Sequence, residues 1–199
     1  MGAAAKHVPL ALIVFRAAAA LIAPLLGWYG LGGLLAALIL LATASDVFDG
    51  IIARRLGVST TGLRRADSAV DLVFWLAGLV ALYFLRSEDM LANWGVIAFG
   101  IGAEIVEQAV SLVRFRRMTA THARSAKFMG LCLLAGMTML ALGGSSAVAF
   151  WVIGIGTAVA AIDGWAIMLI LPHWEADIPS ALAAWGVRAG RPVKRHWLG

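Results

Sequence analysis

The sequence has little charge and almost no cysteine. Of its 199 residues only 14% are charged and 62% are hydrophobic, whereas about a quarter of the residues in a soluble domain are charged. This balance excludes a water-soluble globular protein. The single cysteine, Cys132, lies in an apolar run, which excludes a disulfide framework and a cysteine metal cluster and argues against a redox function of the protein. The chain also lacks an internal repeat, a soluble domain and a nucleic-acid-binding motif.

Long apolar runs dominate the sequence instead. Each approaches the roughly 20 residues with which an α-helix spans a bilayer, and short polar gaps separate them. Runs of this length exclude the short strands of an outer-membrane barrel. We therefore predict an all-α integral membrane protein with a bundle of six transmembrane helices. The predicted spans are 9–28, 31–53, 67–85, 91–113, 126–142 and 147–171.

The two ends of the chain have different characters. Residues 1–171 are predicted to form one membrane domain, in which Arg16 interrupts the first apolar run and favours an uncleaved span over a secretory signal. Residues 172–199 form a tail that contains Trp174, Trp185 and Trp197 together with four basic residues. This composition predicts either a segment lying at the membrane surface or a disordered tail.

The basic residues predict the orientation of the bundle. With six spans both termini share one side, and that side holds 14 of the 16 Lys and Arg residues. The positive-inside rule makes it cytoplasmic. Trp28, Tyr29, Tyr83 and Trp94 gather on the opposite side as an aromatic belt, so the two signals agree. The net charge of +5 then reflects topology and attraction to anionic lipid headgroups.

Ionisable residues inside or beside the apolar runs mark the functional region. An acidic residue at the centre of a transmembrane helix is disfavoured by roughly 2.5–3.5 kcal/mol, so such residues need partners or water. In the predicted topology all of them lie in the cytoplasmic half of their spans and can share one cavity open to the cytoplasm. These residues are Arg16, Asp46, Asp49, Asp67, Asp71, Glu104, Glu107 and Asp163.

Four aspartates form the densest group. Asp46 and Asp49 lie on one stripe of the second span, and Asp67 and Asp71 lie one turn apart at the start of the third. A short basic loop joins these spans as an antiparallel hairpin, so the four carboxylates can face one another. Oxygen ligands without histidine or cysteine favour Mg²⁺ or Mn²⁺ over zinc or copper, and we expect two such ions.

Small residues and an arginine share the stripe of Asp46. Gly50 and Ala53 remove side-chain bulk, which suits either a ligand that approaches the backbone or close packing of helices in the membrane. Arg54 is placed to meet an anion held by the metal ions, or it is the first positive charge after a span.

These residues resemble the CDP-alcohol phosphotransferase family, whose signature reads D-x2-D-G-x2-A-R, about eight residues, then G-x3-D-x3-D. Seven positions match in identity and spacing: Asp46, Asp49, Gly50, Ala53, Arg54, Asp67 and Asp71. At the second glycine the chain has Leu63, with Gly62 one position early, and we expect the loop to shift so that Gly62 supplies the clearance. Pro9 and Arg16 also resemble part of the family's first-span pattern.

The resemblance implies that the chain transfers a phosphatidyl group from a CDP-linked lipid, CDP-diacylglycerol, to an alcohol and releases CMP. It implies that Asp46, Asp49 and Asp67 hold the metal ions, and that Asp71 completes the cluster and acts as the base. It also implies a homodimer in a bacterial-type cytoplasmic membrane, with the active site facing the cytoplasm. The nucleotide would be held by Asp46, Gly50, Ala53, Arg54, Gly62 and Asp67.

A basic run after the fourth span is either a topology signal or a pocket for a phosphorylated acceptor. In the second interpretation Arg114, Arg124 and Lys127 bind the phosphate, and His122 is solvated. Glycerol 3-phosphate is the favoured acceptor, and inositol phosphate, serine or another small alcohol are the alternatives.

The remaining acids have structural and functional interpretations. Glu104 and Glu107 either hydrogen-bond acceptor hydroxyls, pair with Arg16 or line a wet cavity. Asp163 has the same alternatives, and a salt bridge between two helices is the favoured one. A function of another class, divalent-cation transport, would need acidic residues through the full depth of the membrane. Here the acidic residues lie only in the cytoplasmic half of the predicted spans.

Overall fold

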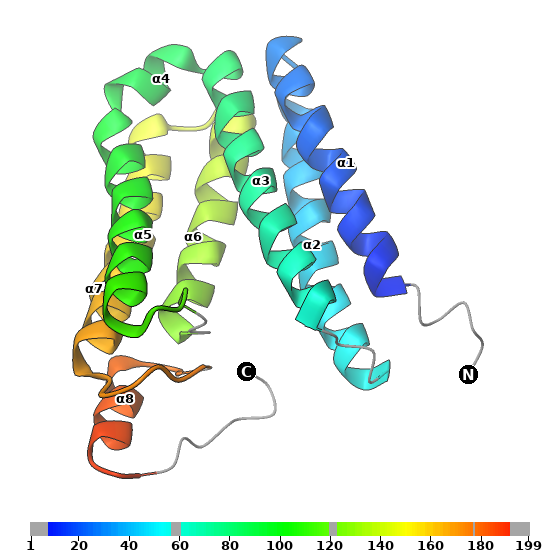
Figure 1. The fold of residues 1–199 in the computed structure, drawn as a ribbon. Coiled ribbons are helices and arrows are strands. Elements are labelled where there is room, and N and C mark those ends of the chain that lie inside the picture. The colour runs from blue at the N-terminus through cyan, green and yellow to red at the C-terminus, as the bar shows by residue number, and fades with distance from the viewer. Residues whose placement is uncertain (1–7, 57–60, 120–122, 177, 192–199) are drawn as a thin grey trace. The chain divides into compact units, whose positions relative to one another are not determined.

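The computed structural model describes residues 8–56, 61–119, 123–176 and 178–191, and the regular secondary structure of these ranges is entirely helical (Figure 1). Unbroken apolar stretches favour helices because every backbone polar group is satisfied within the segment. The helices are α1 Val8–Trp28, α2 Gly32–Leu56, α3 Thr61–Leu85, α4 Ser87–Ala92, α5 Trp94–Phe115, α6 Arg124–Ala141, α7 Ser146–Ile170 and α8 Ala181–Arg188.

Several helices are suited to a bilayer. Among the described residues three are long and apolar enough to cross a membrane, at Leu10–Trp28, Trp94–Phe115 and Ser146–Ile170. Two shorter apolar segments, Gly32–Asp46 and Ala69–Leu85, belong to α2 and α3. The chain is therefore a multi-pass membrane protein, while a total of six spans stays a prediction.

Residues 1–92 and 137–146 form one compact unit. In it α1 packs along both α2 and α3. The packing against α3 is close: a Cβ atom at Gly27 would overlap the backbone carbonyl of Ala81. Small residues allow such approaches between transmembrane helices. The first helix is thus the element that holds the two signature helices together.

The far end of α3 is tied by a polar network in the same unit. Arg86 donates from Nε to Oδ2 of Asp89 at 2.6 Å and from Nη1 to the carbonyl of Leu140 at 3.4 Å. A hydrogen bond from the Ser146 side chain and the neighbouring Arg86 hold the pKa of Asp89 below its usual range. This network fixes α4 at the turn that follows α3.

Residues 93–136 and 147–199 form the second compact unit. The segment after α7 folds back onto it, because Ile178 and Ala184 are buried with Ile167 and Leu171 of the α7 end. Helix α8 begins at an N-cap, Ser180, whose hydroxyl accepts a hydrogen bond from the backbone N–H of Ala183. The described part of the tail is therefore packed rather than disordered.

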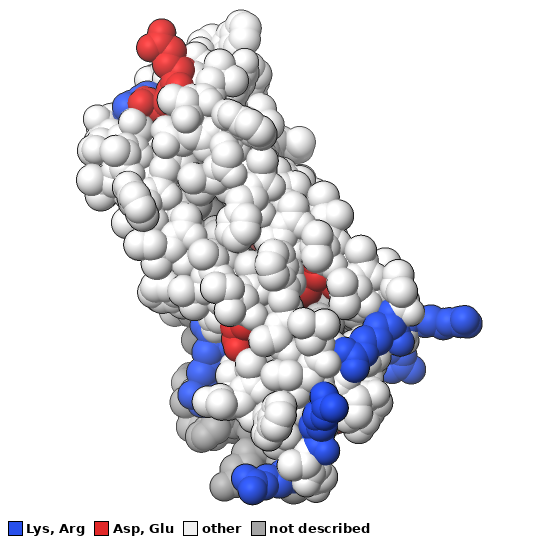
Figure 2. All heavy atoms as spheres, turned by 90° about the vertical axis from the view of Figure 1, so that its left-hand side faces the viewer, with Lys and Arg blue, Asp and Glu red and all other residues white. Residues whose placement is uncertain are grey.

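Large apolar side chains face outward on the long helices. Leu21 is 76% exposed on α1, Val113 is 85% exposed on α5 and Trp151 is 72% exposed on α7. Exposed apolar surface of this extent marks contact with lipid rather than with water. Figure 2 shows white, uncharged atoms over most of one face, with the blue basic atoms mostly toward its lower end.

The predicted spans agree closely with the helices, with two differences. Where a continuous span at 91–113 was expected, the chain forms the short helix α4 and then a break at Asn93 before α5. The helices of the signature extend beyond their predicted spans, to Leu56 in α2 and back to Thr61 in α3. The polar residues of the signature are therefore helical and continue the membrane helices.

Candidate active site

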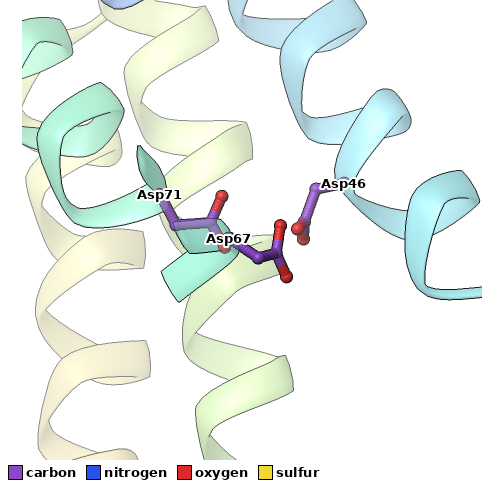
Figure 3. A group of neighbouring side chains, drawn as sticks. All are labelled: Asp46, Asp67 and Asp71. Atoms are coloured by element: carbon purple, nitrogen blue, oxygen red, sulfur yellow. The ribbon is translucent and has the colours of Figure 1, made fainter. Parts of the chain in front are cut away.

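Three aspartates converge in the first unit (Figure 3). Asp46 lies on α2, whereas Asp67 and Asp71 lie one turn apart on the same face of α3. One carboxylate oxygen from each of them lies within 4.8 Å of the others. The sequence predicted this convergence from helical spacing alone, and for these three residues it is confirmed.

Arg16 of α1 reaches the same three carboxylates. Its Nη1 donates to Oδ1 of Asp46 at 2.5 Å and to Oδ1 of Asp71, and its Nη2 donates to Oδ1 of Asp67 at 2.8 Å. The guanidinium is 1% exposed, so these pairs supply the counter-charges that a buried cation requires. Sequence reasoning had named Glu104 and Glu107 as candidate partners and had not connected Arg16 with the aspartates.

The chemistry of this cluster suits a divalent cation. Three carboxylates offer hard oxygen ligands, which Mg²⁺ and Mn²⁺ prefer. Oxygen ligands of one octahedral Mg²⁺ ion are about 3.0 Å apart when adjacent and about 4.2 Å apart when opposite, so oxygens within 4.8 Å can reach a common ion through small changes of side-chain rotamer. The carboxylates are also accessible, since their side chains are 42%, 31% and 30% exposed for Asp46, Asp67 and Asp71. The cluster can therefore bind a metal ion.

The other predicted signature residues fall partly outside what the structure describes. Asp49, Gly50, Ala53 and Arg54 lie on the α2 backbone and Gly62 on the first turn of α3, but their side chains are outside the described residues. The same holds for Leu63, so the expected shift of the loop to Gly62 is untested. The fourth metal ligand and the nucleotide contacts stay predictions.

A separate pocket opens in the second unit among α5, α6 and α7. Its volume is about 130 Å³, and small residues make up much of its wall. Glu104, Glu107, Ser125 and Thr157 give it a polar lining, as the cavity-lining interpretation of the two glutamates anticipates. Gly164 makes room for one of them, because a Cβ atom there would overlap the Glu107 carboxylate.

The three basic residues proposed for the acceptor differ in their surroundings. Arg114 donates from Nη1 to the carbonyls of Met168 and Leu169, the latter at 2.8 Å, at the carboxyl end of α7. A cation at this end is favoured by the helix dipole. Arg124 and Lys127 have exposed side chains at the start of α6. Arg114 thus has a structural role beside the proposed one.

Asp163 connects three elements, in line with its expected bridging role. Its Oδ2 accepts a hydrogen bond from the Ser125 hydroxyl at 2.7 Å, and its Oδ1 accepts one from the backbone N–H of Ala181 at 2.9 Å. It therefore fastens the start of α6 and the start of α8 to α7. The partners are hydrogen-bond donors rather than the salt-bridging cation that the sequence suggested.

Comparison with known proteins adds one finding. A family model described as CDP-alcohol phosphatidyltransferase matches residues 6–170, which include Arg16, the aspartates of the cluster and the polar pocket of the second unit. No curated protein and no solved structure matches the chain.

Proposed function

This chain belongs to the CDP-alcohol phosphatidyltransferase family, and on that premise we propose which substrates it uses. The family activity makes it an enzyme of phospholipid biosynthesis that transfers a phosphatidyl group to an alcohol. The proposed donor is CDP-diacylglycerol, the proposed acceptor is glycerol 3-phosphate, and CMP is released. Membership of an enzyme family also weighs against the alternative of cation transport.

The convergence of Asp46, Asp67 and Asp71 is the observation that supports this proposal most directly. Neighbouring carboxylates repel each other unless positive charge lies among them, and the single charge of Arg16 balances only part of the charge of the three aspartates. In the proposed enzyme they hold Mg²⁺ or Mn²⁺ together with Asp49, and two ions are proposed. A bound divalent ion would supply positive charge to the pyrophosphate of the donor and to the departing CMP.

Asp71 is the proposed base. It accepts the proton of the acceptor hydroxyl while that oxygen attacks the phosphorus on the lipid side of the pyrophosphate. The new phosphorus–oxygen bond forms as the bond to CMP breaks. Asp71 suits this role because its carboxylate is 30% exposed and can be reached by a hydroxyl from outside. The proposed nucleotide-binding residues are Asp46, Gly50, Ala53, Arg54, Gly62 and Asp67.

The proposed site faces the cytoplasm. In the sequence the aspartates flank a basic stretch with Arg54, Arg55, Arg64 and Arg65, so the cluster lies where the apolar runs give way to polar chain. Such a boundary suits a substrate with a polar nucleotide and apolar acyl chains. The basic residues Arg64, Arg65, Arg116 and Arg117 favour the cytoplasmic side by the positive-inside rule. A homodimer in a bacterial-type inner membrane completes the proposal.

The acceptor is assigned from charge. Arg114, Arg124 and Lys127 are the proposed ligands of its phosphate, because guanidinium and ammonium groups suit phosphate oxygens. Their positions near the start of α6 and the end of α5 support a shared location within the second unit. Inositol phosphate and serine are the competing acceptors.

One assay tests donor and acceptor together. Purified protein in detergent with Mg²⁺ and CDP-diacylglycerol is given glycerol 3-phosphate, inositol phosphate, serine or no acceptor, and CMP release is measured. Release that depends on glycerol 3-phosphate supports the proposal. Release with another acceptor alone corrects the acceptor, and no release with CDP-diacylglycerol and any acceptor refutes the proposed donor.

A further inference from the structure

Arg16 occupies the place where a divalent ion would have to bind. It contacts one oxygen of each of Asp46, Asp67 and Asp71, the carboxylates proposed as metal ligands. Its side chain is buried while theirs are partly exposed, so the arginine approaches from the interior and a cation from solvent can reach the other side. The three aspartates thus have one cation built into the fold and remain open to another.

The two cations interfere with each other. A divalent ion about 2.1 Å from Asp46 Oδ1 would lie within about 4.6 Å of Arg16 Nη1, which is 2.5 Å from the same oxygen. Positive charges this close repel each other, and burial of the Arg16 side chain limits the screening of this repulsion by water. A metal bond and a guanidinium hydrogen bond also compete for the lone pairs of the same oxygen. Full occupancy of both positions is therefore unfavourable.

The exchange of one cation for the other is sterically simple. The three aspartates carry three negative charges against the single charge of Arg16, so the cluster still attracts a divalent ion from solvent. The contacts are made by the far end of a flexible side chain, which a change of rotamer withdraws without movement of α1. The helices are expected to stay in place during the exchange, because α1 packs against both α2 and α3.

We propose that Arg16 is a built-in counter-cation, which holds the three aspartates together in the metal-free enzyme and is displaced from them by the divalent ion. This inference rests on the proposed metal site. It makes Arg16 a positioning residue. Removal of its charge lowers the stability of the metal-free protein, because the ion pairs that join α1 to α2 and α3 are lost. It raises the affinity for the divalent ion, because no other cation then competes for the carboxylates.

The affinity for Mn²⁺ tests the competition directly. Free Mn²⁺ is measured by electron paramagnetic resonance during titration of the detergent-solubilised full chain, with neither donor nor acceptor present. Arg16→Met, which keeps a flexible apolar stem and removes the guanidinium charge, is expected to bind Mn²⁺ about tenfold more tightly, and its metal-free form to melt at a lower temperature. Arg16→Lys keeps a cation and is expected to stay within about threefold of the unsubstituted chain.

A matched control removes a different arginine. Arg86→Met breaks an ion pair with Asp89 at the other end of α3, and it is expected to leave the Mn²⁺ affinity unchanged. Mn²⁺ affinity that is unchanged or weaker in Arg16→Met would overturn the proposal, because Arg16 would then be irrelevant to the metal or would support it. Absence of Mn²⁺ binding in all variants would overturn it as well, whatever the outcome of the CMP-release assay.

A second measurement needs no destabilising variant. In protein labelled with ¹⁵N-arginine, the Nε resonance of Arg16 is assigned by its loss in Arg16→Lys and is followed during addition of Mg²⁺. Displacement predicts that this resonance shifts and that its N–H exchanges faster with water. A resonance that stays unchanged at saturating Mg²⁺ would overturn the proposal even if Arg16→Met does not fold.

Discussion

The guanidinium of Arg16 and the carboxylate of Asp67 lie 51 positions apart in the chain, and 2.8 Å separates Nη2 of the first from Oδ1 of the second. This pair joins α1 to α3, and the contact of the same guanidinium with Asp46 adds α2. The acidic cluster is thus a junction of three helices, although the family signature covers only two of them. The first helix therefore belongs to the candidate active site.

Replacement of Asp71 by asparagine tests its role as the base separately from the binding of CDP-diacylglycerol. Asp71→Asn keeps the shape of the side chain and one oxygen but cannot accept the acceptor's proton. We expect turnover to fall by about 100-fold or more, with CDP-diacylglycerol still bound. CMP release and donor binding measure the two effects, and Glu88→Gln, an exposed change on α4, serves as the control. Unimpaired CMP release by Asp71→Asn would remove it as the base.

Lys127 offers the cleaner test of the acceptor pocket, because Arg114 also binds the end of α7. In Lys127→Ala we expect the KM for glycerol 3-phosphate to rise by about tenfold and the KM for CDP-diacylglycerol to stay constant, since a lost phosphate contact weakens only the phosphorylated substrate. Arg188→Ala removes an exposed basic residue of α8 as a control. Equal changes in both KM values would refute the pocket.

The close approach of α1 and α3 predicts a large effect of a single methyl group. Gly27→Ala places a Cβ atom against the backbone of Ala81, which cannot turn away as a side chain can. We expect a loss of about 1–3 kcal/mol in stability, seen as a lower melting temperature in detergent. Gly102→Ala on α5 meets open space and should be neutral or slightly stabilising. Equal melting temperatures for the two variants would contradict the described packing.

The network around Asp89 predicts a dependence of stability on pH. The Ser146 hydrogen bond and Arg86 lower the pKa of Asp89 in the folded chain, so its ionised form stabilises the fold at pH values above the unfolded pKa of about 3.9. This contribution is lost as the pH falls through the folded-state pKa, which lies lower. The melting temperatures of the unsubstituted chain and Asp89→Asn should therefore differ at pH 7 and converge toward pH 3, whereas Glu88→Gln should not show this convergence.

Much of the fold follows from local patterns that the sequence displays. Apolar run length located the long helices to within a few residues, and spacing on a helix placed Asp46 opposite the pair Asp67 and Asp71. The short helix α4 was missed because six residues contain too little periodicity, although Glu88 and Asp89 in its first turn are favoured there by the helix dipole. The start of helix α8 could have been predicted from its N-cap residue, Ser180. It was missed because the tail was interpreted from its tryptophans.

The partners of Arg16 could not be derived in the same way. Helical spacing states which residues share a face, but it does not state which neighbouring helix that face meets. Arg16 stood near several acids along the sequence, and the choice among them depends on how α1 packs on α2 and α3. The sequence did indicate that Arg16 has a partner, because a cation inside an apolar span requires one.

The contacts of Arg16 also have a consequence for membrane insertion, because the ribosome synthesises the chain from its N-terminus. Arg16 is synthesised before any of its carboxylate partners, and Asp71 follows 55 positions later. At roughly 5–20 residues per second this interval lasts about 3–11 seconds. During biogenesis the first helix must therefore stay beside the translocation machinery or near the headgroups until the third arrives, so that insertion of these helices is expected to be concerted rather than stepwise.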